Sequence, residues 1–170
     1  MALQGGAVAS AGPSNTAAVC TFEAHEVASP GFSSAPGGGV SRTDPPGVIT
    51  CVGVIEGRRL SGDSGTIFYE YHFGTALPAQ AMGGDSCILF SGLAENTTVT
   101  LPMAEGGDIR LVGVLEAAGT AAGGVGRIAA GNAVGNFVLE FRSEPDHLDE
   151  DCVTKPIQHF ITTGQGTLTG

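Results

Sequence analysis

The stretch Gly65-Thr66-Ile67-Phe68-Tyr69-Glu70-Tyr71-His72-Phe73 decides the fold class of this chain. It is rich in β-branched and aromatic residues, which are enriched in β-strands. Successive side chains of a strand point to opposite faces, so the stretch has two different faces. One face is aliphatic and aromatic and consists of Ile67, Tyr69, Tyr71 and Phe73. The other face carries Phe68, Glu70 and His72. The stretch therefore predicts a strand with its aromatic face against a core.

Similar blocks occur later in the chain and indicate an internal duplication. Three blocks match in the same order: residues 51–56 with 111–116, residues 65–72 with 135–142, and Cys87 with Cys152. Three ordered matches are not expected by chance, and their unequal separations place the length differences in loops. We therefore predict two equivalent units, the first over about residues 47–103 and the second over about residues 107–170.

The remainder of the chain also predicts strands. No segment has an apolar helical stripe longer than two turns, and apolar runs of strand length alternate with turns rich in Gly and Pro. We expect a single all-β domain of about eight to nine antiparallel strands over residues 20–170. Residues 1–19 are expected to form a flexible leader. Residues 28–46 are predicted to be a long loop, and residues 117–134 a Gly- and Ala-rich hairpin connection.

The pseudo-twofold duplication is compatible with two architectures. Two equivalent halves can close into a barrel or face each other as a two-sheet sandwich. We favour barrel-like closure because it leaves fewer exposed strand edges. The chain has a single lysine, Lys155, with which to protect such an edge.

The charge of the chain limits its partners. Its formal net charge is −10 at pH 7. A surface of this sign repels phosphate backbones and anionic lipids, so neither nucleic acid nor a membrane is an expected partner. No run approaches the roughly 20 continuous apolar residues that cross a bilayer. The composition, rich in Ala, Gly, Val and Thr, is similar in style to small secreted β proteins of actinobacteria and identifies no family.

Four cysteines indicate an oxidising compartment. No two of them form a C-x-x-C pair, which argues against zinc and for two disulfides. We therefore expect a secreted, extracellular protein. The pairing stays open between two patterns: Cys51–Cys87 with Cys20–Cys152, or Cys20–Cys51 with Cys87–Cys152.

The polar face of the opening strand holds the candidate catalytic residues. Glu70 and His72 are two residues apart, where a carboxylate and an imidazole could exchange a proton near neutral pH. Glu140 and Arg142 occupy the equivalent positions of the second unit. If this face lines a barrel lumen, these residues form an acid–base site. We favour an outward face with both pairs solvated, because aromatic and aliphatic residues normally fill a core.

No metal or cofactor site is predicted. The four histidines include no i,i+2 or i,i+4 pair that would suggest zinc, and His159 lies among apolar residues. The acidic residues within 146–151 could offer oxygen ligands to Ca²⁺, but they lack the glycine and the spacing of an EF-hand. The chain also contains no phosphate-binding loop and no nucleophile elbow.

These observations leave three classes of function. The leading hypothesis is a secreted, non-catalytic β-domain protein with a filled interior and a binding, protective or surface role. The first alternative is a cofactor-free β-barrel cyclase or isomerase that holds an apolar small molecule in a cavity lined by Glu70 or Glu140. The second is a self-assembling extracellular subunit that associates through the leader or through residues 28–46.

Overall fold

Eleven strands and no helix make up the part of the chain that this computed structural model describes, which comprises residues 15–35, 37–73, 90–120, 123–130 and 135–170. The strands are β1 (Ala17–Phe32), β2 (Gly39–Thr43), β3 (Gly47–Ile55), β4 (Arg58–Arg59), β5 (Ser64–Phe68), β6 (Glu70–Phe73), β7 (Phe90–Pro102), β8 (Asp108–Thr120), β9 (Gly123–Ala130), β10 (Asn136–Pro145) and β11 (Ile157–Thr169). A search of the same residues finds no helix of the length and apolarity that a membrane span requires. The all-β class predicted from the sequence is confirmed.

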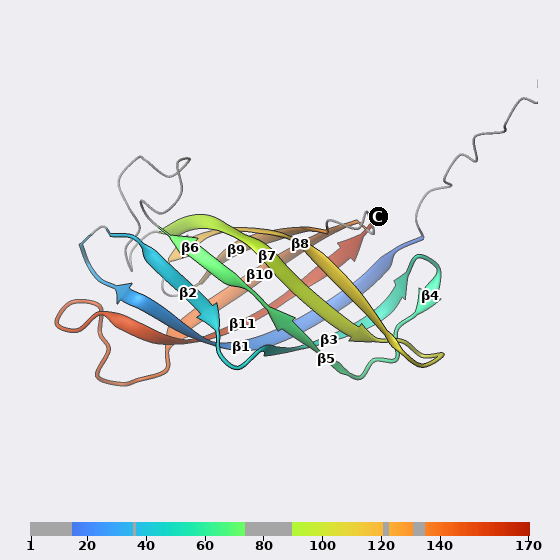
Figure 1. Cartoon of the computed structure of the whole chain (residues 1–170), viewed down its shortest axis with the longest axis horizontal. Coiled ribbons are helices and arrows are strands. Elements are labelled where there is room, and N and C mark those ends of the chain that lie inside the picture. The colour runs from blue at the N-terminus through green and yellow to red at the C-terminus, as the bar shows by residue number, and fades with distance from the viewer. Residues whose placement is uncertain (1–14, 36, 74–89, 121–122, 131–134) are drawn as a thin grey trace, which may run out of the picture.

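Antiparallel pairing carries the sheet around in a ring. From β1 the order runs through β11, β10, β9 and β8 to β7. β7 pairs with β5, β5 pairs with β3, and β3 returns to β1. In Figure 1, β2, β6 and β7 cross in front of β1 and β11, so this barrel-like sheet can also be described as two facing layers.

β1 changes partner along its length. Its residues 17–23 pair with β3, and its residues 26–29 pair with β2. Pro45 and Pro46 lie between β2 and β3, and neither has the N–H group that a continuous strand would donate. The change of partner falls at Glu26, the first β1 residue in register with β2. This break in the sheet therefore lies beside the one acidic residue of β1 that faces the lumen.

The expectation of a long loop over residues 28–46 is wrong. β1 continues to Phe32, and β2 is already paired with β1 on one side and with β6 on the other. Pro30 fits because the register of β1 against β11 is irregular between Val27 and Phe32. A residue without an N–H group costs no ladder hydrogen bond at such a bulge.

The predicted connection over residues 117–134 contains a strand. β8 continues to Thr120, and β9 pairs with both β8 and β10; residues 121–122 and 131–134 lie outside the described residues. Gly and Ala have low strand propensity, and pairing on both sides of β9 outweighs it. As a result β3 and β5 are neighbours, whereas their predicted counterparts β8 and β10 are separated by β9. The internal duplication stays a prediction.

The start of the first strand differs from the expected one. β1 begins at Ala17, inside the segment expected to be a leader, of which residues 1–14 lie outside the described part of the chain.

The stretch over residues 65–73, predicted as one strand, forms parts of two, β5 and β6, which are separated at Tyr69, and it supplies the centre of the core. Every residue of its aromatic face is buried: Ile67, Tyr69, Tyr71 and Phe73. Phe73 stacks on Phe32 of β1, with ring centroids 4.0 Å apart. Phe32 meets Phe160 of β11 edge to face, with centroids 5.4 Å apart. Aromatic pairs in these geometries stabilise a core beyond the burial of their area, so this cluster holds β1, β6 and β11 together.

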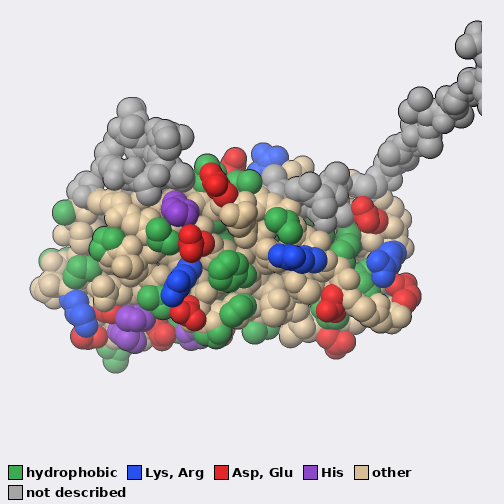
Figure 2. Space-filling model, viewed as in Figure 1, with side chains coloured by type: hydrophobic (Ala, Val, Ile, Leu, Met, Phe, Trp, Pro, Cys, Tyr) green, Lys and Arg blue, Asp and Glu red, His purple; other side chains and the backbone are tan. Residues whose placement is uncertain are grey.

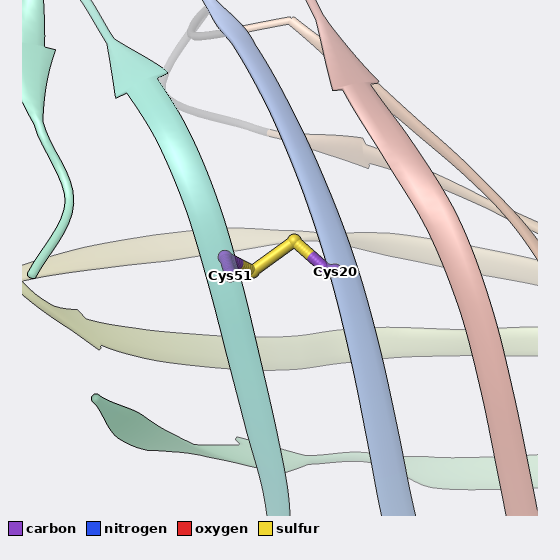
Figure 3. The surroundings of a disulfide bond; sticks show 2 residues. All are labelled: Cys20 and Cys51. Carbon is purple, nitrogen blue, oxygen red and sulfur yellow. A yellow bond between two sulfur atoms is a disulfide. The ribbon is translucent and has the colours of Figure 1, made fainter. Parts of the chain in front are cut away.

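One disulfide joins the first two long strands of the ring. Cys20 of β1 and Cys51 of β3 lie directly opposite each other in the register, with Cα atoms 4.1 Å apart (Figure 3). Both side chains face the core. The structure thus selects the second of the two predicted pairings at this position. No described cysteine is a free thiol, and Cys87 lies outside the described residues.

The double variant Cys20→Ala/Cys51→Ala is expected to unfold at a lower temperature than the wild-type protein. The disulfide joins residues 31 positions apart. A link of this length restricts the unfolded chain and stabilises the fold by about 3–4 kcal/mol. Thermal unfolding followed by circular dichroism should give a midpoint lower by about 6–16 °C.

The control for this experiment is Thr21→Ala/Thr50→Ala, the next pair in the same register. It alters neighbouring positions of both strands without touching the disulfide. If the cysteine variant unfolds at the same temperature as this control, the covalent link contributes nothing beyond the strand pairing.

Candidate ligand-binding site in the barrel lumen

A pocket lies in the lumen of the barrel. Its cavity volume is about 70 Å³. Its walls are mainly aromatic and aliphatic and are formed by Phe22, Phe32, Ile67, Tyr71, Leu115, Ala117, Leu139, Phe141 and Phe160. Its remaining lining residues are Glu26, Ser41, Tyr69, Ser143 and Thr162. An apolar cavity with a few grouped polar side chains is the usual form of a small-molecule site.

Glu26 is the one carboxylate among these lining residues, and three hydroxyl groups donate to it. Tyr69 Oη and Thr162 Oγ1 each lie 2.6 Å from Glu26 Oε1. Ser41 Oγ donates to Glu26 Oε2 at 2.8 Å. The donors come from β11, from β2 and from the residue between β5 and β6. Strands far apart in the sequence therefore assemble a single polar cluster around a β1 carboxylate.

A fourth hydroxyl extends the cluster. Ser143 Oγ lies 2.8 Å from Thr162 Oγ1, and both side chains are buried. A threonine hydroxyl has one proton, and that of Thr162 goes to Glu26. Ser143 is therefore the donor to Thr162. Ser143 thus reaches the carboxylate of Glu26 through Thr162, whereas Tyr69 and Ser41 donate to it directly.

Tyr69 stays protonated in this arrangement. Burial of its side chain raises its pKa well above the usual value, and the adjacent negative charge of Glu26 raises the pKa further. A protonated phenol is the form that can donate to Glu26. The phenol of Tyr69 is therefore a hydrogen-bond donor at neutral pH.

A glycine in β11 makes space for the Phe22 ring in the pocket wall. Phe22 and Gly164 of β11 are in register, and a Cβ atom at position 164 would overlap the Phe22 ring. Glycine at this position therefore lets the ring lie over β11 and form part of the pocket wall.

The four candidate catalytic residues lie outside this pocket. Glu70 and His72 are on the outer face of β6, half-buried, with His72 Nε2 3.3 Å from Glu70 Oε1. Glu140 and Arg142 are exposed on β10. On the face of the molecule in Figure 2, acidic and basic side chains are likewise interspersed with uncharged ones. The structure therefore places both predicted pairs on the solvated face that the sequence favoured.

The sequence analysis missed Glu26, although a signal for it was present. Cys20, Phe22 and Ala24 face the core at alternate positions of β1, and Glu26 continues the same series. An acidic residue on the inward parity of a strand is unusual unless it is paired. Its hydroxyl donors could not be found in this way, because they lie 15 to 136 residues away along the chain.

A second group of polar side chains lies at the loop between β10 and β11. His159 Nδ1 is 2.9 Å from Glu150 Oε1, and His147 Nδ1 is 3.4 Å from the same oxygen. Burial alone would raise the pKa of Glu150, but hydrogen bonds from the His159 ring and from the backbone N–H groups of His159 and Gln158 outweigh it and lower the pKa to about 2. The three side chains have the types that bind divalent metals.

Comparison of this chain with protein-family models, with curated proteins and with solved structures finds no match. The functional argument therefore rests on the geometry of the pocket and of its polar cluster.

In the variant Tyr71→Phe, which leaves Tyr69 as the one tyrosine of the chain, the native protein is expected to show no tyrosinate absorbance at pH 10. The pKa of Tyr69 is raised, so its contribution to stability is present below the ordinary pKa of about 10 and is lost as the pH rises through the raised value. An absorbance titration with parallel circular dichroism measures this.

The same variant unfolded in denaturant serves as the reference, and its tyrosine should titrate at about 10. A native circular dichroism spectrum together with half-formed tyrosinate at this pH would contradict the buried, Glu26-bonded position of Tyr69.

Proposed function

We propose that this protein binds an apolar small molecule in the lumen pocket and holds a hydrogen-bond donor of that molecule against Glu26. The observation that carries the proposal is the polar cluster of Glu26, Tyr69, Ser41 and Thr162 in an otherwise aromatic and aliphatic pocket. A core built only for stability would gain more from an apolar residue at position 26, because burying a charge is costly even when it is paired.

The three hydrogen bonds of Glu26 do not use all the acceptor positions of its carboxylate, so a ligand can donate one more. Oε1 accepts two hydroxyls, whereas Oε2 accepts one, from Ser41. A carboxylate oxygen has two lone-pair positions, so Oε2 can accept one more donor. A ligand hydroxyl or amine could take that position while its apolar part contacts the aromatic walls. Such a bond to a charged acceptor is stronger than one between neutral groups, and it would orient the ligand.

The compartment that supports this function is extracellular. The Cys20–Cys51 disulfide is typical of proteins that work in an oxidising environment. We therefore retain the secreted location, and with it a binding or carrier role for an apolar compound that is poorly soluble in water. This keeps the binding role of the leading hypothesis from the sequence but departs from the filled interior that it predicted, because the binding site is assigned to the lumen.

A second candidate function is catalytic, and one observation favours it. The Ser143–Thr162–Glu26 chain of hydroxyls ends at a carboxylate inside the pocket. A carboxylate that faces a bound apolar molecule can act as a general base, and an ordered cavity can hold a flexible substrate in one reactive conformation. The reaction class would be a cofactor-free isomerisation or cyclisation, with Glu26 in the role that the sequence analysis gave to Glu70 or Glu140.

4-Butylphenol is expected to bind the protein more tightly than 4-butylanisole, which has the same apolar part and no donor. A hydrogen bond to a charged acceptor contributes about 1.5–3 kcal/mol, which corresponds to roughly a 10- to 100-fold preference. Isothermal titration calorimetry with both compounds measures this preference. Glu26→Gln should reduce it several-fold, because the acceptor loses its charge.

The matched control is Glu140→Gln, which makes the same change on the outer face and should keep the preference. A second control is Ala117→Trp, which fills the pocket and should abolish binding of both compounds. Equal binding of the two compounds by the wild-type protein would contradict the role of Glu26 as hydrogen-bond acceptor for the ligand. Unchanged binding by Ala117→Trp would show that the compounds bind outside the pocket.

Native mass spectrometry separates the two candidate functions. A small molecule that co-purifies with the protein is identified, and the free compound is then incubated with fresh protein. Recovery of the unchanged compound supports a carrier. A product of the same mass that chromatography separates from the compound, formed by the wild-type protein and not by Glu26→Gln, supports the enzyme.

A further inference from the structure

We propose that His147, Glu150 and His159 form a binding site for a divalent transition-metal cation. The site lies at the loop between β10 and β11, which is at the left of Figure 1, and it is separate from the polar cluster around Glu26. Figure 2 shows histidine side chains among acidic and basic ones at this end of the molecule. The proposal does not depend on the proposed function of the lumen.

The fold holds the carboxylate of Glu150 in place. Its side chain is 1% exposed. Its Oε2 accepts the backbone N–H groups of Gln158 and His159 at 2.8 and 2.9 Å. These two bonds come from the first residues of β11, so the loop and the strand orient the carboxylate together. Oε1 is left directed at the two histidine rings. A metal-binding carboxylate is typically oriented by hydrogen bonds to its second oxygen in this way.

Two distances within the cluster match those between ligands of one zinc ion, and all three ligand atoms lie within 4.8 Å of one another. Zinc lies about 2.0–2.2 Å from nitrogen and carboxylate ligands, so two ligands at angles of 90–110° are separated by roughly 2.9–3.5 Å. The two histidine nitrogens lie 2.9 and 3.4 Å from Glu150 Oε1. The present spacing around this oxygen therefore suits an ion without movement of the backbone.

One ring has to turn for both histidines to bind. The rings of His147 and His159 are stacked, with centroids 4.0 Å apart, whereas a metal ion lies in the plane of each ring that binds it. His147 is 48% exposed and lies in the turn over residues 146–149, so its ring can leave the stack. His159 is held by β11. Glu150 and His159 thus form the fixed half of the site, and His147 the closing half.

The surroundings attract a cation. Asp146, Asp149 and Asp151 lie in the same loop as Glu150, and Lys155 is paired with Asp149. A cluster of one sign raises the local concentration of ions of the opposite sign. Two imidazoles favour Zn²⁺, Co²⁺, Ni²⁺ or Cu²⁺ over Ca²⁺ and Mg²⁺, which prefer oxygen ligands only. Water can complete the coordination, because both rings are partly exposed.

The sequence analysis had no means to find this group. His147 and His159 are 12 positions apart, which is outside the spacings that mark zinc ligands on one helix or strand. The turn after β10 and the start of β11 bring them to the same carboxylate. The three residues belong to two elements whose relative position only the fold determines.

Zinc titration tests the proposal with tag-free, chelator-treated protein that keeps its disulfides. Isothermal titration calorimetry with ZnCl₂ should show one zinc per chain. His147→Ala and His159→Ala should each weaken binding by at least about 10-fold, the loss that removal of even an outer-shell partner causes. Co²⁺ should give the visible absorption bands of a cobalt–imidazole complex, and these bands should be lost in the same variants.

The matched control is His72→Ala, which removes a half-buried histidine that also lies beside a carboxylate, Glu70, but has no second histidine in its cluster. It should bind zinc like the wild type. Absence of zinc binding would overturn the proposal. So would binding that is unchanged in the double variant His147→Ala/His159→Ala, or Ca²⁺ binding as tight as zinc binding, since the acidic loop alone would then explain the ion.

Discussion

The pairing of β1 on both of its sides is the constraint on which the rest of this structure depends. β1 is hydrogen-bonded to β11 along one edge and to β3 and then β2 along the other. These pairings join the first described strand of the chain to the last one and close the ring. Buried backbone groups must be hydrogen-bonded, and pairing on both sides satisfies those of β1. Closure also creates the lumen, and therefore the pocket.

The lumen explains why an acidic residue is tolerated in the middle of β1. Glu26 follows three residues that face the core, and a single carboxylate there would be strongly unfavourable without partners. The closed sheet brings Tyr69, Ser41 and Thr162 to it from three directions. Each hydroxyl group donates a hydrogen bond to the carboxylate, so the carboxylate gains a partner and the hydroxyl group does too. The same geometry places the carboxylate in the lining of the pocket.

The strand–turn pattern of the sequence was sufficient to predict the fold class. It was also sufficient to predict which residues of the stretch 65–73 face the core. The alternation at Ile67, Tyr69, Tyr71 and Phe73 predicts their burial, which the structure confirms. The pattern failed where pairing outweighs propensity, as in the Gly- and Ala-rich strand β9, and where proline stands at a bulge, as in β1. Neither β9 nor the end of β1 has a strong local preference for strand, and both are held by neighbours.

The sequence by itself determined that this is an acidic all-β protein with an aromatic strand face for its core. It favoured disulfides and an outer face for Glu70, His72, Glu140 and Arg142, and left both open. These properties follow from composition and from the two-residue period of a strand, which are local. Only the tertiary structure decided the Cys20–Cys51 pairing, the polar cluster of Glu26 and the group of His147, Glu150 and His159. The first two depend on the register between strands distant in the sequence, which the pairing of the whole sheet sets. The third depends on how the loop after β10 folds against the start of β11.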